Sequence, residues 1–163
     1  MKHGMLLVLA CVALTTVFGT TYVFAQSRAG SDTQPVNRLW FGSPSELDRI
    51  SQMVEIGRTE DAVELAQDFA SKMKSGPYHY DALNALCVAL NANKQSDEAI
   101  AICNEAIDNR PSHWMAYNSR GTAYFTKGEY EKAVEDYSRA LQLYPSSDTV
   151  KFNLALAQSR LNP

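Results

Sequence analysis

His79 and His113 are the residues of this chain whose type and spacing come nearest to a chemical site. They lie 34 residues apart, and imidazole nitrogens are common ligands of zinc. A structural or catalytic zinc ion takes three or four ligands from the protein, however, and no third ligand follows at a fitting spacing. We therefore expect two loop histidines and no metal site.

The rest of the sequence offers no pattern that would support catalysis. It contains no nucleophile motif, no pair of carboxylates arranged for acid–base work and no glycine-rich phosphate loop. The sequence therefore disfavours an enzyme, such as a hydrolase acting on the envelope, and it predicts no cofactor. What remains is a set of regularly spaced residues that indicates structure.

Three prolines mark a repeat of 34 residues, at Pro77, Pro111 and Pro145. Segments 80–113 and 114–147 match almost position for position, with alanines, asparagines and large apolar residues in the same places. A fixed period of this length is typical of stacked structural units rather than of a single irregular core.

Each unit is predicted to be two helices joined by a tight turn. Apolar residues recur at three- and four-residue spacing, as at Leu86 and Leu90, and no sustained alternation suggests a strand. A polar break lies in the middle of each unit, at 93–96 and 126–129. Ser96, followed by two acidic residues, is expected to cap the second helix of its unit, and the proline at the end of the unit stops that helix.

Unit 114–147 carries small and aromatic residues at fixed places. They are Gly121, Tyr124, Ala133, Tyr137, Ala140 and Pro145. In this order and spacing they resemble the signature of the tetratricopeptide repeat family. Unit 80–113 is looser, because Cys87 stands in place of the glycine and Cys103 in place of the large residue before Ala106.

The resemblance implies an all-α protein, a solenoid of about three helix hairpins and a C-terminal capping helix in a right-handed superhelix. The predicted repeat domain covers residues 43–161. Its parts are a degenerate repeat at 43–79, two repeats at 80–113 and 114–147, and the capping helix at 148–161. Arrays of this kind need terminal units with a polar outer face, and the last helix is expected to provide one.

Residues 1–25 have the composition of a secretory signal peptide. A short positive head precedes an uncharged run from Met5 to Ala25, which ends in a small residue before Gln26. The run has 21 residues and is long enough to span a membrane, so an uncleaved anchor is the alternative. We therefore expect a periplasmic or secreted protein, or else a membrane-anchored one whose repeat domain lies outside the cytoplasm.

Residues 26–42 are polar and without period, and they predict a flexible linker. Trp40 and Phe41 near its end are expected to pack on the first helix pair, with an exposed motif for a partner as the alternative. Without residues 1–25 the chain has 14 basic and 18 acidic side chains, a net charge of −4. It also lacks a dense basic patch, so nucleic-acid binding is disfavoured.

The resemblance also implies a place for a ligand. In this family the inner face of the first helix of each unit usually lines the binding groove. By position, that face holds Asn84, Val88, Asn91, Asn118, Thr122 and Phe125. The paired asparagines suit the backbone of an extended peptide, because each amide can donate and accept a hydrogen bond.

None of the six predicted groove residues is basic, which disfavours a groove that clamps a C-terminal carboxylate. The alternatives are simply solvated polar residues, or a site on the Trp40–Phe41 tether or the convex face.

Two further residues of the last unit have expected structural roles. Arg120 occupies a place that the family usually fills with an apolar residue. Because an unpaired buried charge is costly, Asp136 on the partner helix is expected to be its counter-ion. Gly121 is expected at the closest contact between the two helices.

Cys87 and Cys103 are the cysteines left once residues 1–25 are removed, because Cys11 lies within that segment. An even count in an exported chain suggests a disulfide, and both residues fall at positions that the family uses for packing within a hairpin. Helix axes in a packed pair lie about 8–10 Å apart, however, whereas a bridge needs Cα atoms within about 7 Å. Two small buried hydrophobes are therefore favoured over the bridge, which stays open as the alternative.

Together these patterns predict a non-enzymatic protein–protein interaction module, an adaptor or scaffold that is exported across the inner membrane. Its partner is expected to be a protein or peptide. Contact with a membrane is expected only through an uncleaved N-terminal segment. The alternative function is a membrane-tethered assembly factor that supports envelope or secretion machinery.

Overall fold

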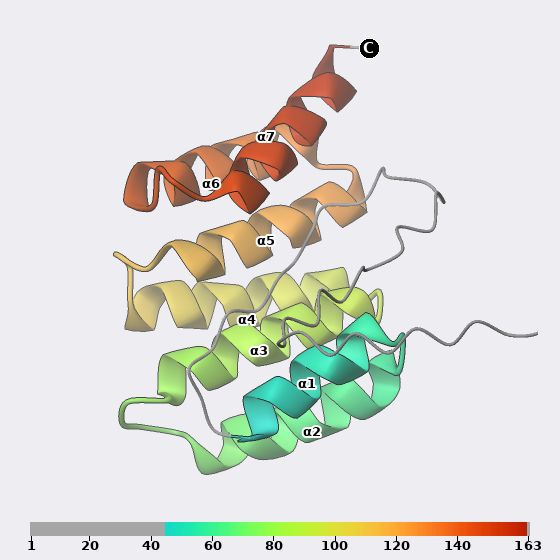
Figure 1. Ribbon diagram of the computed structural model, residues 1–163, viewed down its shortest axis with the longest axis vertical. Helices are drawn as coiled ribbons and strands as arrows, with labels where there is room; N and C mark the ends of the chain where they lie inside the picture. Colours follow the sequence, from blue (N-terminus) through green and yellow to red (C-terminus); the bar gives the residue numbers. More distant parts are fainter. Residues whose placement is uncertain (1–44, 163) are drawn as a thin grey trace, which may run out of the picture. The chain divides into compact units, whose positions relative to one another are not determined.

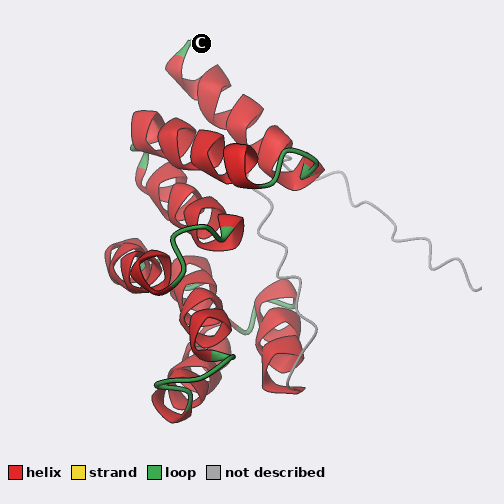
Figure 2. Cartoon of the chain, turned by 90° about the vertical axis from the view of Figure 1, so that its left-hand side faces the viewer, coloured by secondary structure: helices red, strands yellow, loops and turns green. Residues whose placement is uncertain are grey.

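The computed structural model describes residues 45–162, and this part of the chain consists of helices joined by short loops (Figure 2). Its helices are α1 (Ser45–Glu55), α2 (Thr59–Lys72), α3 (His79–Ala92), α4 (Ser96–Asn109), α5 (Trp114–Lys127), α6 (Tyr130–Leu143) and α7 (Asp148–Leu161). No strand occurs between residues 45 and 162. The expected signal peptide (1–25), the linker (26–42), Trp40 and Phe41 lie outside the described residues.

The helices pair in chain order to form three hairpins, α1–α2, α3–α4 and α5–α6, which are followed by α7 (Figure 1). Each helix packs against the next one along the chain. The first helices of the hairpins also contact one another, α1 with α3, α3 with α5, and α5 with α7. Among the described residues α2, α4 and α6 make no such contacts with one another. The predicted all-α solenoid of three hairpins and a C-terminal helix is confirmed.

The three turns inside the hairpins share one backbone conformation. In the middle turn, the N–H of Gln95 donates to the carbonyl of Leu90 at 2.9 Å and that of Lys94 donates to the carbonyl of Asn91 at 3.0 Å. This pair of bonds is the Schellman ending of a helix, and it recurs after α1 and after α5. One residue of each turn has a positive φ: Gly57 (80°), Lys94 (63°) and Gly128 (81°).

Gly121 lies at a close contact of α5 with α6. A Cβ atom added there would lie 2.9 Å from two ring carbons of Tyr137 and 3.2 Å from Cβ of Asp136. Tyr137 is fully buried, and its hydroxyl donates to the Thr122 hydroxyl at 3.2 Å. Only a glycine therefore leaves room for the tyrosine ring this close to the backbone of α5.

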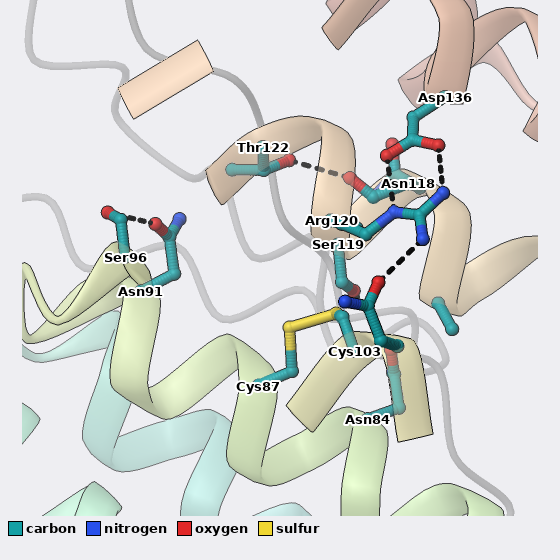
Figure 3. Close-up of a disulfide and its surroundings, with 12 residues drawn as sticks. Asn84, Cys87, Asn91, Ser96, Cys103, Asn118, Ser119, Arg120, Thr122 and Asp136 are labelled. Atoms are coloured by element: carbon teal, nitrogen blue, oxygen red, sulfur yellow. Dashed lines mark hydrogen bonds and ion pairs between the residues drawn. A yellow bond between two sulfur atoms is a disulfide. The ribbon is translucent and has the colours of Figure 1, made fainter. Parts of the chain in front are cut away.

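Cys87 and Cys103 face each other across α3 and α4, and a disulfide joins them (Figure 3). Their Cα atoms are 5.5 Å apart, inside the limit of about 7 Å that a bridge requires. The expectation of two small unbridged hydrophobes is therefore wrong. Both cysteines are fully buried in the core that α1 to α4 share.

Arg120 of α5 pairs with Asp136 of α6, as the sequence predicts. Its Nε and Nη2 atoms donate to the two carboxylate oxygens at 2.8 and 2.7 Å (Figure 3). Its Nη1 donates to Asn104 of α4 at 2.6 Å. The guanidinium thus links three helices. Burial raises the pKa of Asp136, and the bonds from Arg120 partly offset this rise.

Ser96 does not cap α4, contrary to the sequence expectation. It is the first residue of the helix, and its hydroxyl donates to Oδ1 of Asn91 on α3 at 2.9 Å. The residue at the cap position, Gln95, makes no side-chain bond to the helix. The serine is buried because the turn folds it against α3, so its hydroxyl closes the hairpin instead.

Candidate functional site

The candidate site is a groove of about 670 Å³ where the C-terminal parts of α1, α3 and α5 meet the first turn of α4. Its lining residues are Val54, Val88, Asn91, Ala92, Lys94, Ser96, Asp97, Thr122, Thr126 and Lys127. They come from all three hairpins, so the groove exists only because the units stack. It combines aliphatic side chains with hydroxyl, amide and charged groups.

A chain of hydrogen bonds fixes the polar side chains of the groove. Asn91 of α3 accepts from Ser96 at 2.9 Å and donates to the Thr126 hydroxyl of α5 at 3.5 Å. Thr126 in turn donates to the carbonyl of Thr122 at 2.9 Å, within α5. This chain holds α3, α4 and α5 in register at the groove, so its polar groups are placed before any ligand arrives.

Three of the six residues predicted for the groove line it: Val88, Asn91 and Thr122. All three are largely buried, Asn91 being 8 % exposed. They present only a small part of their surface to a ligand. The other three predicted residues lie outside the lining.

Asn84 and Asn118 connect neighbouring first helices instead of facing the groove. Oδ1 of Asn84 accepts from the Ser119 hydroxyl at 2.9 Å, and Oδ1 of Asn118 accepts from Nδ2 of Asn153 at 3.0 Å. The same contact therefore recurs one repeat later, between α3 and α5 and then between α5 and α7. The two asparagines are 1 % and 3 % exposed, and Nδ2 of Asn84 has no acceptor within residues 45–162.

Phe125 is also buried, in the core of the last units. Its ring meets that of Tyr130 edge to face, with centroids 5.2 Å apart. It belongs to the same buried cluster as Tyr137 and residues of α7. This position therefore contributes packing to the hairpin α5–α6 and not surface to the groove.

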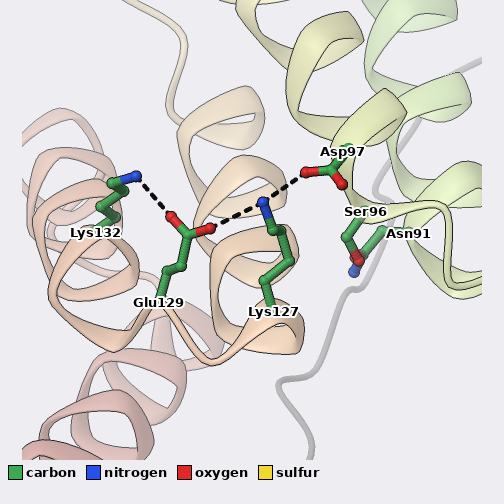
Figure 4. A network of polar contacts seen from close by, with 6 residues as sticks. All are labelled: Asn91, Ser96, Asp97, Lys127, Glu129 and Lys132. Carbon is green, nitrogen blue, oxygen red and sulfur yellow. Dashed lines mark hydrogen bonds and ion pairs between the residues drawn. The ribbon is translucent and has the colours of Figure 1, made fainter.

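Two charged residues at the rim of the groove, Asp97 and Lys127, were missed by the prediction from helix faces in the sequence. Lys127 donates to Asp97 at 2.5 Å and lies 2.9 Å from Glu129, which also pairs with Lys132 (Figure 4). The bonds to Asp97 and Glu129 raise the pKa of Lys127, and those from both lysines lower the pKa of Glu129. The pair of Lys127 with Asp97 bridges the second and third hairpins.

Lys94 is the second lysine of the groove. It makes no ion pair with any of residues 45–162. The sequence signal that could find it is its place in the turn, where the other two hairpins carry glycine. A prediction based on helix faces does not include the turns.

The two histidines take separate structural roles. Nδ1 of His79 lies 2.7 Å from the carbonyl of Met73, and the ring of His113 lies against Tyr80 with centroids 4.6 Å apart. Burial lowers the pKa of His113. Between residues 45 and 162 no group of three or more histidines, cysteines or carboxylates is arranged to hold a metal ion.

Comparison with known proteins identifies the family to which this chain belongs. Two models described as tetratricopeptide repeat match residues 54–113 and 114–147, which together are more than half of the chain. The chain belongs to the tetratricopeptide repeat family. Within the described part, no helix is both long and apolar enough to cross a membrane.

Among curated proteins, the chain is similar to DnaJ homolog subfamily C member 3 of Gallus gallus. The two are 28 % identical over 120 residues, which cover 71 % of this chain and 23 % of the relative. The chain thus spans about a quarter of the length of the curated relative that it matches.

Solved tetratricopeptide-repeat domains share the fold. The first such domain of human RPAP3 has a TM-score of 0.63 and 23 % identity, over 71 % of this chain and 89 % of that domain. The second domain of human RPAP3, solved in complex with the HSP70 peptide SGPTIEEVD, has a TM-score of 0.59 and 24 % identity, over 70 % and 92 %.

Proposed function

We propose that the chain is a non-enzymatic interaction module, an exported adaptor or scaffold that binds an extended peptide in the groove between α1, α3 and α5. The observation that carries the proposal is the groove. Its aliphatic side chains, among them Val54 and Val88, can pack against the side chains of a peptide. Its amide and hydroxyl groups, on Asn91 and Thr126, can bond the peptide backbone.

The similarity to a peptide-binding domain supports this use of the groove. The second tetratricopeptide-repeat domain of human RPAP3 was solved with an HSP70 peptide. A peptide needs little more than a preformed channel with a few fixed polar groups, since an extended backbone carries its own donors and acceptors. The hydrogen bonds of Asn91 and Thr126 provide such fixed groups here.

Export rests on two observations that are independent of the groove. Residues 1–25 have the composition of a signal peptide. The bond between Cys87 and Cys103 fits an oxidising compartment such as the periplasm, because cytosolic proteins keep their thiols reduced. The alternative is a membrane-tethered assembly factor held by an uncleaved segment 1–25.

The mass of the mature protein in the native host separates these two forms. Loss of the first 25 residues from a soluble fraction supports export with cleavage. The full mass in the membrane fraction supports the tethered form. Recovery of a full-length, reduced chain from the cytoplasm contradicts both.

Photo-crosslinking tests the groove in the native host. A photoreactive phenylalanine analogue replaces Thr126 in the groove or, as the control, Glu105, which is exposed on α4 outside it. We expect a discrete adduct from position 126 and none from position 105. Equal adducts from both positions, or an adduct from position 105 alone, would place the binding surface elsewhere.

A further inference from the structure

The turn between α3 and α4 differs from its two counterparts in one residue. All three turns use the same Schellman bonds and a positive φ. Gly57 and Gly128 take this conformation without cost, because glycine has no Cβ. Lys94 takes it at φ 63°, where a residue with a Cβ is disfavoured. A side chain is thus present at the place where the fold itself favours none.

Lys94 lines the groove, and it forms no ion pair with any residue between 45 and 162. It lines the groove together with Asn91 and Thr126. Lys127, another lysine of the lining, is already shared by two carboxylates. No carboxylate within residues 45–162 pairs with Lys94. Of the two lysines that line the groove, Lys94 is therefore the one whose charge no described residue neutralises.

We propose that Lys94 selects the partner of the groove: it binds an acidic side chain, Asp or Glu, within the extended peptide. This inference rests on the proposed function and names the chemistry of its ligand. Charge complementarity carries it, because Asp97 is occupied by Lys127 and Lys94 is the lining residue whose charge no described residue neutralises. Lys94 lines the groove together with Asn91 and Thr126, so in this proposal the amide and hydroxyl groups bond the peptide backbone while the lysine pairs with the acidic side chain.

Selection from a random peptide library tests this specificity while the natural partner is still unidentified. The probe is a library of nine-residue peptides fused to a phage coat protein through their C-termini, so that no free C-terminal carboxylate is present. The full chain without residues 1–25 is the target, as wild type, Lys94→Asn and Lys94→Glu. Asparagine tolerates a positive φ better than most residues do, so the neutral variant keeps the turn. Lys74→Gln, on a loop outside the groove, is the matched control.

We expect the wild type and Lys74→Gln to select peptides rich in Asp and Glu at one position. Lys94→Asn should lose that preference, and Lys94→Glu should select Lys or Arg there. A selected acidic peptide, synthesised with an amidated C-terminus, should bind Lys94→Asn about three- to tenfold more weakly than wild type, with a smaller salt dependence.

The outcomes separate the two proposals. If peptides bind in the groove equally well with and without Lys94, the proposed role of Lys94 is wrong, whereas the proposal that the groove binds a peptide is supported. Failure of every form of the chain to select any peptide would overturn both. The melting temperature of Lys94→Asn should equal or exceed that of wild type, so that weaker binding cannot come from a weakened fold.

Discussion

The hairpins α3–α4 and α5–α6 meet the same packing requirement with different chemistry. Gly121 and Tyr137 form a close contact of α5–α6, where the ring lies against a backbone without Cβ. One repeat earlier, the same two places hold Cys87 and Cys103, whose Cα atoms are 5.5 Å apart and whose sulfurs are bonded. A glycine and a ring are thus exchanged for two small side chains and a covalent bond.

This exchange shows that the repeat fixes the distance between its helices more strictly than it fixes the residues. The glycine–tyrosine pair fills the contact with one large side chain. The cysteine pair fills it with two small ones and depends on oxidation to hold them. The stability of α3–α4 is therefore tied to a redox state, whereas that of α5–α6 is not.

The largest expected effect is that of Gly121→Leu, which disrupts the contact between position 121 and the ring of Tyr137 in α5–α6. A side chain at position 121 would meet the ring of Tyr137 at its first carbon, 2.9 Å away. We expect the free energy of unfolding to fall by about 3 kcal/mol or more, because a packed core cannot accept the added volume. Urea denaturation measures the fall. A loss of less than about 1 kcal/mol would mean that α5 and α6 are not held at this distance.

Removal of the bond in α3–α4 should have the next largest effect. Cys87 and Cys103 are separated by 16 positions, and closing a loop of this length stabilises a protein by about 3 kcal/mol at most. The double variant Cys87→Ala with Cys103→Ala should lose up to that amount in oxidising buffer. Reducing agent should destabilise the wild type and leave the double variant unchanged.

A variant of α3–α4 that carries the glycine and tyrosine of α5–α6 tests the comparison further. Cys87→Gly together with Cys103→Tyr gives α3–α4 the pair found in α5–α6, and it should recover part of the stability lost with the disulfide. Mass spectrometry with alkylation before and after reduction provides the check on the bond itself. Two thiols that alkylate freely in the unreduced, denatured protein would contradict it.

A smaller loss is expected from the ion pair that links α5 to α6. Arg120→Ala leaves the buried carboxylate of Asp136 without its two donors, which we expect to cost about 2 kcal/mol. The double variant Arg120→Met with Asp136→Leu should recover much of this loss, because it buries no charge. If the double variant is as unstable as the single one, the pair itself and not the stranded charge stabilises the fold.

The smallest expected effects come from substitutions in the turns, and one of these substitutions should raise the stability. Lys94→Gly should stabilise the chain by about 1 kcal/mol, since it relieves a positive φ. Gly128→Ala should destabilise it by a similar amount for the same reason. Thermal unfolding of the two variants provides the comparison. A loss of stability in Lys94→Gly would show that the lysine supports the turn rather than a ligand.

The repeat and its hairpins could be predicted from the sequence because proline period and helical spacing are local signals. The pairing of Arg120 with Asp136 followed from the cost of burying a charge. The direction in which Asn84 and Asn118 face could not be predicted, because a polar residue on a helix looks the same whether it meets solvent or the next helix. Their partners, Ser119 and Asn153, lie 35 residues further along the chain.

The disulfide and the rim of the groove show two further limits. General helix spacing argued against the bridge, whereas the 5.5 Å between Cα atoms depends on how tightly this hairpin packs. Lys94 and Lys127 reach the groove from a turn and a helix end, which a comparison confined to helix faces does not include. Stacking brings these places together, and no single repeat contains that information.

Peptide binding in the groove is the central claim, and nuclear magnetic resonance of the chain without residues 1–25 tests it most directly. The probe is a peptide obtained from the library selection, titrated into the isotope-labelled protein. We predict chemical-shift changes concentrated at Asn91, Lys94, Ser96 and Thr126, which line one groove on α3, α4 and α5. Changes confined to the outer surfaces of α2, α4 and α6, or to residues 26–42, would contradict the claim.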